Sequence, residues 1–183
     1  MRRITAALFH SVDGVVEAPH RWQFDSFDDD LGAAMSAMIG STTTVLLGRI
    51  GYQEWADYWP AAAASDAFGS FINPVEKLVA SRTLTGELVW ENSRLIEGDL
   101  IEAVAALKQG EGGDVAVNAS ISLVRQLLFA GLLDALTLIV HPVVAGEGRH
   151  LFEPGGPTTR LVLHEARNTS KGNVILTYGR PSR

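Results

Sequence analysis

The chain has 183 residues, of which 46% are hydrophobic and 20% are charged, a size and balance typical of one compact domain with one core. Its formal net charge of -6 argues against a nucleic-acid partner, which needs clustered Lys and Arg side chains. The chain has no cysteine, so disulfide bonds and thiolate chemistry are excluded. Its apolar runs fall short of the roughly 20 residues that span a bilayer, and its start lacks the pattern of a signal peptide. We therefore expect a cytoplasmic protein with no membrane partner.

Apolar runs rich in β-branched residues alternate with amphipathic stretches, which is the pattern of strands joined by crossover helices. Ser26 with Asp29 forms a capping pair for the first expected helix, and Pro60 is expected to end the second. Residues 61–65 are small and weakly patterned, which predicts a mobile connection. The expected elements in the first half are strands at residues 4–9 and 44–47 and helices at about residues 28–39 and 52–59.

The second half continues this alternation and then changes character. One helix is expected to begin after Asp99 and to end at Gly110 in a left-handed conformation, and a second helix ends at Gly131. Pro142 is expected at a twist or bulge within a long apolar strand. The expected strands lie at residues 75–80, 88–90, 115–117 and 136–144, followed by an antiparallel hairpin of residues 161–166 and 174–178.

The order of these elements predicts an α/β fold in a single domain of residues 1–183, with a mostly parallel mixed central sheet, flanking helices and a C-terminal antiparallel hairpin. Such sheets bind ligands at the carboxyl ends of their strands. Four junctions at strand ends carry residues suited to a ligand, namely Ser11-Val12-Asp13-Gly14, Leu46-Leu47-Gly48-Arg49, Val79-Ala80-Ser81-Arg82-Thr83, and Asp114 to Ser120.

Each junction also has a plain structural explanation. Asp13-Gly14 is a common turn, a single Arg at a strand end is most often a solvated surface charge, and Ser120 is an ordinary helix N-cap. Arg49 and Arg82 at the ends of successive strands together favour an anionic ligand. No G-x-G-x-x-G or Walker sequence is present, which disfavours a standard Rossmann or P-loop protein.

Read in order, these junctions resemble the dihydrofolate-reductase-like family, and most closely its bacterial branch related to the C-terminal reductase domain of riboflavin biosynthesis. The resemblance covers nearly the whole chain and is most specific in its last segment. The residues that carry it are Ser11 to Glu17, Leu46 to Trp55, Val79 to Leu84, Gly131 to Asp134 and His141 to Phe152.

The resemblance implies a three-layer fold, NADPH as the cofactor, a small-molecule substrate and a homodimer. It also implies residue roles. Contacts with the nicotinamide half are implied for Ala6, Ala7, Asp13 and Gly14, and contacts with phosphates for Gly48 and Arg49. Contacts with the adenosine 2′-phosphate are implied for Ser81 and Arg82, and contacts along the pyrophosphate for Asn118, Ala119, Ser120, Ile121 and Ser122.

The sequence departs from the family pattern at two positions. The family usually has glycine where this chain has Ala119, and an alanine methyl there costs about 1 kcal/mol or more if the peptide needs a positive φ or close cofactor approach. The family's Gly-Arg-x-Thr-Tyr string has threonine where this chain has Gly51, which removes a possible hydroxyl contact.

Catalysis by a nicotinamide cofactor needs few side chains, because the hydride chemistry belongs to the cofactor. Asp28, in an acidic cluster at the start of the first helix, is a candidate proton partner, although acidic residues also favour helix starts without any catalytic role. Trp22, Phe24 and Trp55 are candidates for the wall of a substrate pocket, although large aromatics are more often core residues. The histidines follow no metal-binding spacing.

Three hypotheses remain open from the sequence. The leading one is an NADPH-dependent reductase of a small heterocyclic substrate that is pterin-like or pyrimidine-like, in the manner of dihydrofolate reductase or 5-amino-6-(5-phosphoribosylamino)uracil reductase. The second is a nucleotide-binding protein of the same fold without turnover, which Ala119 keeps open. The third is a metal-assisted hydrolase that uses the acidic cluster.

Overall fold

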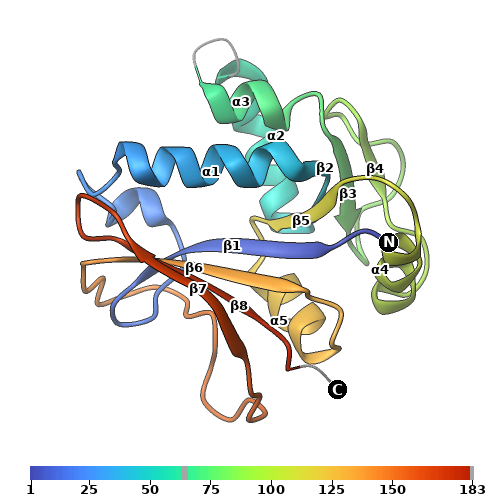
Figure 1. Ribbon diagram of the computed structural model, residues 1–183. Helices are drawn as coiled ribbons and strands as arrows, with labels where there is room; N and C mark the ends of the chain where they lie inside the picture. Colours follow the sequence, from blue (N-terminus) through green and yellow to red (C-terminus); the bar gives the residue numbers. More distant parts are fainter. Residues whose placement is uncertain (63–65, 182–183) are drawn as a thin grey trace.

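The computed structural model describes residues 1–62 and 66–181, and in this part of the chain the strands form one eight-stranded sheet in the order β4-β3-β2-β5-β1-β6-β8-β7. Neighbouring strands are parallel from β4 to β6, whereas β8 is antiparallel to both β6 and β7 (Figure 1). The strands are β1 (Ile4–Ser11), β2 (Thr42–Gly48), β3 (Glu76–Ala80), β4 (Ser93–Leu95), β5 (Asp114–Asn118), β6 (Ala135–His141), β7 (Val162–Asn168) and β8 (Val174–Gly179).

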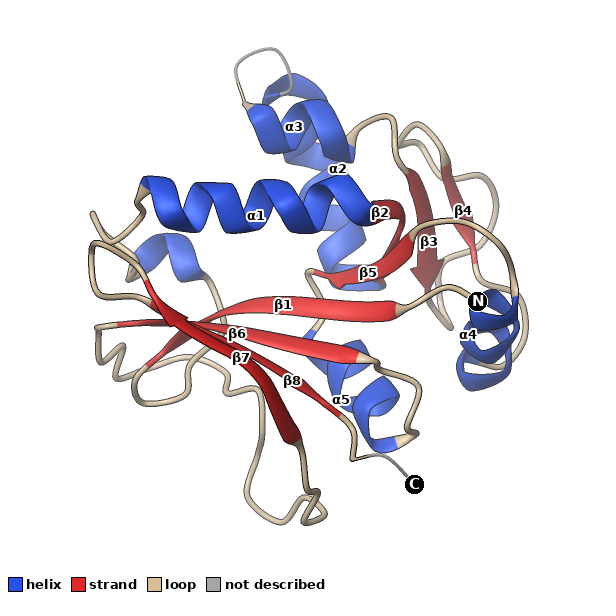
Figure 2. Cartoon of the chain, in the orientation of Figure 1, coloured by secondary structure: helices blue, strands red, loops and turns tan. Residues whose placement is uncertain are grey.

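Helices cover both faces of this sheet (Figure 2). They are α1 (Asp29–Ser41), α2 (Arg49–Ala62) and α3 (Ala67–Ile72) on one face, α4 (Leu100–Gln109) and α5 (Ile121–Phe129) on the other, with a short 3-10 helix at Pro19–Arg21 after β1. The predicted α/β class, the mostly parallel sheet, the flanking helices and the C-terminal hairpin are all confirmed.

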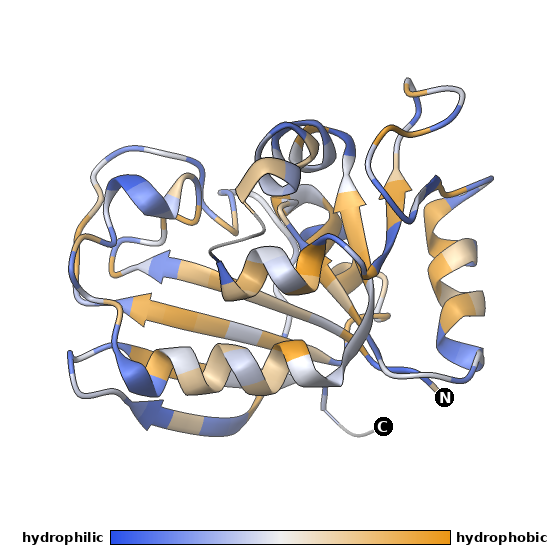
Figure 3. Ribbon diagram, turned by 90° about the horizontal axis from the view of Figure 1, so that it is seen from above, coloured by the Kyte–Doolittle hydropathy of each residue, from blue (hydrophilic) through white to orange (hydrophobic). Residues whose placement is uncertain are grey.

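Alternation along the buried strands divides the core between the two faces. Val45 and Leu47 of β2 pack in the cluster that includes residues of α2 and α3, whereas Leu46 between them packs in the cluster with α4 and α5. Successive side chains of a strand point to opposite faces, so an uninterrupted apolar run serves both helical layers. In Figure 3 the inner strands are largely hydrophobic, whereas an outer strand and many loop segments are hydrophilic.

Several predicted element ends are wrong, each for a local reason. The cap of α1 is Asp28, whose Oδ1 accepts from the Leu31 N–H at 2.9 Å, while the Ser26 hydroxyl donates to the Gln23 carbonyl instead. Gly110 ends α4 with φ −71°, so it is not left-handed.

Proline positions also differ from the prediction. β6 ends at His141, directly before Pro142, because proline has no N–H for the ladder. Helix α2 continues through Pro60 to Ala62, where the Trp59 and Phe68 rings lie 5.0 Å apart and hold its last turn against α3.

Two predictions between α2 and α4 also need correction. The expected strand at residues 88–90 is absent, and the chain pairs with β3 slightly later, at Ser93–Leu95. Helix α3 was not predicted. Its N-cap is Asp66, a residue type that is common at helix starts, and the Asp66 side chain accepts from the Phe68 and Gly69 N–H groups. The expected connection at residues 61–65 is helical at its first two positions, and residues 63–65 lie outside the described residues.

Ionic contacts join the elements at the amino ends of the strands. Lys108 Nζ lies 2.5 Å from both carboxylate oxygens of Asp134 and 3.1 Å from the Leu132 carbonyl. Asp134 Oδ2 also accepts from the Ile4 N–H at 2.8 Å. Buried Arg2 donates to Thr44 Oγ1 at 2.6 Å and to Thr43 Oγ1 at 3.0 Å in β2, and to the Gly113 carbonyl, directly before β5, at 2.9 Å. These contacts tie β1, β2, α4 and β6 together away from the carboxyl ends.

Lys77 is fully buried at the same amino edge, in β3. Its ammonium donates to the carbonyls of Ile72, Asn73 and Val75 at 3.0, 2.6 and 2.8 Å, at the end of α3, and lies 4.6 Å from the centre of the Trp90 ring. Burial lowers the pKa of Lys77 to about 8. Three carbonyls and an aromatic face explain how a buried cation is accommodated. Within the described residues, no helix is long and apolar enough to cross a membrane.

Candidate functional site

Five neighbouring parallel strands end at one edge of the sheet, and all four predicted junctions follow them there. The strand order places β2 between β3 and β5, and β1 between β5 and β6. The junctions after β1, β2, β3 and β5 therefore line a continuous edge, joined by the segment that follows β6. The structure thus brings together residues that are widely separated in sequence.

The starts of α2 and α5 touch at this edge. Helix α2 begins at Arg49 directly after β2, and α5 begins at Ile121 after the cap residue Ser120. A Cβ atom placed on Gly48 would lie 2.5 Å from Ser120 Oγ, so only glycine permits this approach. The unpaired N–H groups of two adjacent helix starts favour an anion, and phosphate is the usual one.

Ala119 and Gly51 form a second contact between the same two turns. Ala119 has φ +48° and is exposed, and buried Gly51 lies against it. A Cβ atom on Gly51 would lie 2.2 Å from the Ala119 carbonyl oxygen and 2.6 Å from the Ala119 methyl carbon. The two departures from the family pattern therefore meet in space, and the glycine at position 51 makes room for the alanine at position 119.

The two predicted arginines follow neighbouring strands, Arg49 directly after β2 and Arg82 after β3. Arg49 is exposed and its Nη1 donates to Gln53 Oε1 at 2.9 Å. Ser81 Oγ accepts from the Thr83 and Leu84 N–H groups at 3.1 and 2.9 Å, which shapes the turn that carries exposed Arg82. No described residue pairs with the Arg82 guanidinium, so it is free to meet a ligand.

Asp13 holds the segment after β1 against the segment after β6. Its carboxylate accepts from Ser11 Oγ at 2.6 Å and from the N–H groups of Ala145 and Gly146 at 2.9 and 2.8 Å. These hydrogen bonds hold the pKa of Asp13 well below its usual range. Gly14 follows with φ +94°, where a Cβ atom would lie 3.0 Å from the His150 ring. The Asp13 side chain is thus engaged in the fold, and the predicted nicotinamide contact at this turn stays a prediction.

The two alanines of β1 that were predicted at the nicotinamide face opposite sides of the sheet. Ala6 is 2% exposed and packs in the core under α5, whereas Ala7 is half-buried on the other face. Ala6 can reach a ligand through its backbone only.

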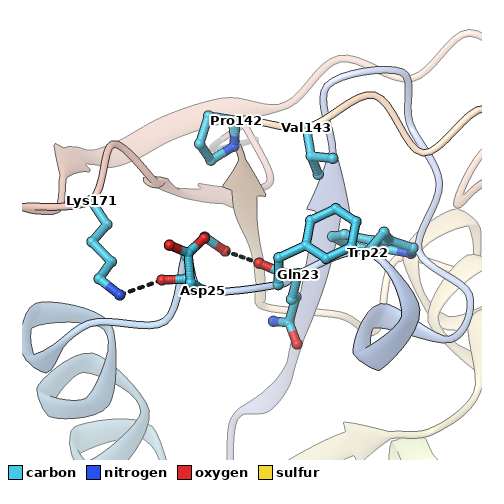
Figure 4. A pocket seen from close by; sticks show the side chains of 8 residues that line it. Trp22, Gln23, Asp25, Pro142, Val143 and Lys171 are labelled. Atoms are coloured by element: carbon cyan, nitrogen blue, oxygen red, sulfur yellow. Dashed lines mark hydrogen bonds between the residues drawn. The ribbon is translucent and has the colours of Figure 1, made fainter.

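A pocket of about 340 Å³ opens between the segment before α1 and the segment after β6 (Figure 4). Two of the predicted substrate residues, Trp22 and Phe24, line it, whereas Trp55 packs against Trp59 and Phe68 in the core under α2 and α3. The complete lining consists of Trp22, Gln23, Phe24, Asp25, Ser26, Pro142, Val143 and Lys171. The sequence interpretation missed Gln23 and Lys171, because polar residues in loops carry no periodic signal.

Phe24 is unusual among these lining residues. It has φ +47° and is 78% exposed, although a bulky residue rarely adopts a left-handed conformation. Backbone strain of this kind costs on the order of 1 kcal/mol and is found most often at functional sites.

His141 supports the floor of the pocket. It is fully buried between the Phe9 and Trp22 rings, at centroid distances of 5.4 and 5.7 Å. Its Nδ1 lies 2.6 Å from Ser26 Oγ and its Nε2 lies 3.1 Å from the Gln23 amide nitrogen. Because the Ser26 hydroxyl donates to a backbone carbonyl, we infer that Nδ1–H donates to Ser26 and Nε2 accepts from Gln23. Burial lowers the pKa of His141, which is consistent with this neutral ring.

Asp28, the predicted catalytic residue, joins the start of α1 to the tip of the β7–β8 hairpin. Its Oδ1 caps the Leu31 N–H and its Oδ2 accepts from the Lys171 N–H at 2.8 Å. Lys171 Nζ also donates to the Asp25 carbonyl, and Asn173 Nδ2 donates to the Ser26 carbonyl at 2.6 Å. The hairpin tip is thus fixed as a wall of the pocket.

The pKa of Asp28 is lowered to about 2. Desolvation raises this pKa, but hydrogen bonds from Thr169, Leu31, Lys171 and Ser170 together outweigh it. Asp28 is therefore a carboxylate near neutral pH and carries no proton to donate. A catalytic role for Asp28 remains a prediction, and its contacts support a positioning role.

We expect the unfolding free energy of the Asp28→Asn variant to fall less steeply at acid pH than that of the parent protein. The folded pKa lies below the ordinary value of 3.8, so the carboxylate's contribution is complete above about pH 4 and is lost as the pH falls through about 2. Asparagine keeps an oxygen for the Leu31 N–H but cannot titrate. Urea unfolding at about pH 5 and about pH 3 should show a smaller loss of unfolding free energy in this variant. Asp29→Asn is the control, because the Asp29 side chain lacks these contacts, and its unfolding free energy should fall with pH as steeply as that of the parent protein. Equal slopes in all three proteins would contradict the role assigned to the Asp28 carboxylate.

No three His, Asp or Glu side chains of residues 1–62 and 66–181 form a group that could hold a metal ion. Two carboxylates of the acidic cluster instead contact the hairpin tip: Asp28 Oδ2 accepts from the Lys171 N–H at 2.8 Å, and Asp30 Oδ2 accepts from the Ser170 N–H at 2.9 Å. The hydrolase hypothesis therefore has no candidate metal site in this part of the chain.

Comparison with known proteins gives a family match and one curated relative. The family model for the RibD C-terminal domain matches residues 2–175. The uncharacterized protein YyaP of Bacillus subtilis (strain 168) is 28% identical over 181 residues, which cover 97% of this chain and 94% of the relative.

Solved structures share the fold. A diaminohydroxyphosphoribosylaminopyrimidine deaminase/5-amino-6-(5-phosphoribosylamino)uracil reductase from Thermotoga maritima matches with a TM-score of 0.67 and 13% identity, over 98% of this chain and 57% of that chain. Dihydrofolate reductase from Enterococcus faecalis, complexed with NADP(H) and RAB-propyl, matches with a TM-score of 0.59 and 13% identity, over 98% and 97% of the two chains. The fold is therefore dihydrofolate-reductase-like.

Proposed function

Because the chain belongs to the RibD C-terminal domain family, we propose that it is an NADPH-dependent reductase of a small, planar heterocycle that is pterin-like or pyrimidine-like. The observation that carries the proposal is the contact between the starts of α2 and α5, with Arg49 at the start of α2 and Arg82 after the neighbouring strand β3. This arrangement supplies two sets of unpaired N–H groups and two guanidinium groups at one sheet edge, which suits a ligand with several phosphates.

The residues at this edge fit a dinucleotide phosphate. Helix starts after β2 and β5 would meet the pyrophosphate, and Ser81 with Arg82 would meet the 2′-phosphate. The nicotinamide would then lie toward the ends of β1 and β6, next to the pocket. The cofactor, when bound, supplies the hydride. The residues of this chain orient the two reactants and keep them in contact.

The pocket suits the substrate side of this reaction. Its volume of about 340 Å³ lies at the small end of the usual range for ligand pockets, which favours a compact ring system. Phe24 and Trp22 offer aromatic surface to a planar ring, and Gln23 and Asp25 offer polar groups to its edge. His141 and Asp28 act as positioning residues, because they fix the loop and the hairpin tip that form the walls.

Selectivity for NADPH over NADH tests the proposal. Arg82→Ala should weaken NADPH binding on the order of tenfold to thirtyfold and leave NADH binding nearly unchanged, since only NADPH carries the 2′-phosphate. Tryptophan fluorescence titration measures both affinities. Arg94→Ala is the matched control, because Arg94 is an exposed arginine whose contact is the Glu76 carboxylate.

Absence of binding by either nucleotide would overturn the proposal. Tight binding without oxidation of NADPH across a panel of pterins and pyrimidines would favour a nucleotide-binding protein without turnover. The strained Ala119 is the observation that keeps this second function in view.

A further inference from the structure

The pocket between the segment before α1 and the segment after β6 carries little positive charge. Asp25 and Lys171 are the two charged residues in its lining. The Lys171 ammonium donates to the Asp25 carbonyl (Figure 4), and Asp28 Oδ2 accepts from the Lys171 N–H at 2.8 Å. Asp30 Oδ2 accepts from the neighbouring Ser170 N–H at 2.9 Å. Three acidic residues therefore lie around one lysine at this wall of the pocket.

The arginines of the nearby loops do not reverse this balance. Arg149 Nε lies 2.7 Å from Glu17 Oε1, and Arg149 and Arg21 both lower the pKa of Glu17, so these two cations share a carboxylate. The guanidinium groups of Arg49 and Arg82 follow β2 and β3, where the proposed function assigns them to the cofactor. An anionic substituent in the pocket would therefore face mainly carboxylates, which repel it.

Exposed apolar side chains gather beside the same pocket. Phe24, in its lining, is 78% exposed. Val143 also lines the pocket, and Val144 directly after it is 69% exposed. The Val12 N–H donates to the Val143 carbonyl at 2.8 Å, and Val12 is 62% exposed. Single exposed apolar residues are ordinary, but several of them together beside a pocket mark a surface that a ligand covers.

The backbone holds the Phe24 ring at this surface at a cost to stability. Its φ of +47° is left-handed, and its turn is closed by the Ser26 N–H, which donates to the Gln23 carbonyl at 3.1 Å. Because the ring is largely exposed, it gains little from packing. Neither the turn nor the core requires a phenyl ring here, so contact with a planar ligand explains it best.

We propose that the pocket takes an uncharged planar heterocycle with an apolar substituent, and that it discriminates against rings with a carboxylate or phosphate substituent. The ring stacks on Phe24 and its substituent lies against the valines beside the pocket. Asp25 and the neighbouring acidic residues repel an anion. The inference rests on the proposed function, because it names the substrate class of the same site.

Matched ligands test the charge preference. The pairs are 6-methylpterin with 6-carboxypterin and 6-methyluracil with orotate, in which a methyl group and a carboxylate occupy the same ring position. Calorimetric titration of the full chain, with and without NADP⁺, should show that the methyl member binds about tenfold tighter in each ring system that binds. A carboxylate member that binds as tightly as its methyl partner would overturn the proposal, as would absence of binding by both methyl members.

Removal of one carboxylate tests the cause of this preference. Asp25→Asn should strengthen binding of the carboxylate members by about threefold to tenfold and leave the methyl members nearly unchanged, because it removes a like charge. Asp57→Asn is the matched control, since it makes the same change at an exposed residue of α2. Equal responses of the two variants would overturn the role assigned to Asp25.

Phe24→Gly separates binding from stability. Glycine adopts a left-handed φ freely, so this variant should melt at the parental temperature or above, while its affinity for the methyl members falls about tenfold. Phe24→Tyr keeps a stacking ring and should bind them like the parent. Unchanged affinity in Phe24→Gly would overturn the stacking role. A lower melting temperature would also overturn it, because it would show that the ring serves the fold.

NADPH titration distinguishes this inference from the proposed function. The Asp25→Asn and Phe24→Gly variants should bind NADPH like the parent, because the phosphate contacts lie elsewhere. A protein that prefers the methyl members but binds neither NADPH nor NADH would support this inference and overturn the reductase function. A protein that binds NADPH and prefers the carboxylate members would overturn this inference alone.

Discussion

Replacing Gly51 by alanine is expected to destabilise the protein by about 2 to 3 kcal/mol. The new methyl carbon would lie 2.2 Å from the Ala119 carbonyl oxygen and 3.0 Å from its carbonyl carbon, and backbone atoms cannot turn away as a flexible side chain does. The start of α5 would have to move from the start of α2. Urea unfolding followed by circular dichroism measures the loss.

Gly40→Ala is the matched control for this prediction. Gly40 is also a helical glycine, in α1, and a Cβ atom there would meet nothing within 4 Å. Alanine should stabilise that position by about 0.5 to 1 kcal/mol, because it is a better helix former than glycine. Two variants with the same chemical change should therefore move in opposite directions. A Gly51→Ala protein as stable as Gly40→Ala would contradict the close contact.

Movement of the start of α5 away from the start of α2 should also weaken cofactor binding. If the proposed phosphate site lies at this contact, Gly51→Ala should weaken NADPH binding on the order of tenfold, whereas Gly40→Ala should not change it. Adding Ala119→Gly to Gly51→Ala should restore part of both losses, since it removes the methyl at 2.6 Å and frees the peptide to adjust. Ala119→Gly alone should change NADPH affinity little, because Gly51 already accommodates the methyl group.

Asp134→Ala is expected to cost about 2 to 3 kcal/mol of unfolding free energy. The change removes both carboxylate contacts of Lys108 and the acceptor of the Ile4 N–H. The Lys108 side chain is only 15% exposed and Ile4 is fully buried, so neither group gains full access to water in exchange.

Arg94→Ala serves as the comparison for this ion pair. The Arg94 and Glu76 side chains are 61% and 41% exposed, so their contact should contribute less than about 1 kcal/mol. Thermal or urea unfolding of both variants gives the difference directly. NADPH affinity below the melting temperature should be unchanged in both, because both pairs lie away from the carboxyl ends of the strands. Equal destabilisation by the two substitutions would contradict the role assigned to Asp134.

The sequence allowed the fold class and the sheet edge that gathers the candidate junctions to be predicted, because both follow from local patterns. Apolar runs such as residues 136–141 identify buried strands, and Asp99 and Ser120 mark helix starts, as the structure confirms. Gly131 has φ +74°, in agreement with its predicted role as a helix stop.

Features that depend on contacts between distant segments could not be predicted in this way. In the sequence, Gly51 and Ala119 are two separate departures from the family pattern. Only the packing of β2 beside β5 shows that the two residues lie in contact. Trp55 and Trp22 were both predicted to line the substrate pocket. Trp55 lies on α2, however, and its side chain packs into the core between α2, α3 and the sheet. The pocket depends on the docking of Lys171 near Asp25 and Asp28, which no local pattern encodes.

The ionic contacts at the amino ends of the strands have a consequence for directed evolution of this protein. Arg2, Lys77 and the Lys108–Asp134 pair secure the sheet at the end opposite the pocket. Substitutions in the pocket wall, at Phe24 or Gln23 for example, leave these contacts intact. Libraries that vary the pocket should therefore contain a large share of folded members, and selection among them can act on substrate preference with little loss to misfolding.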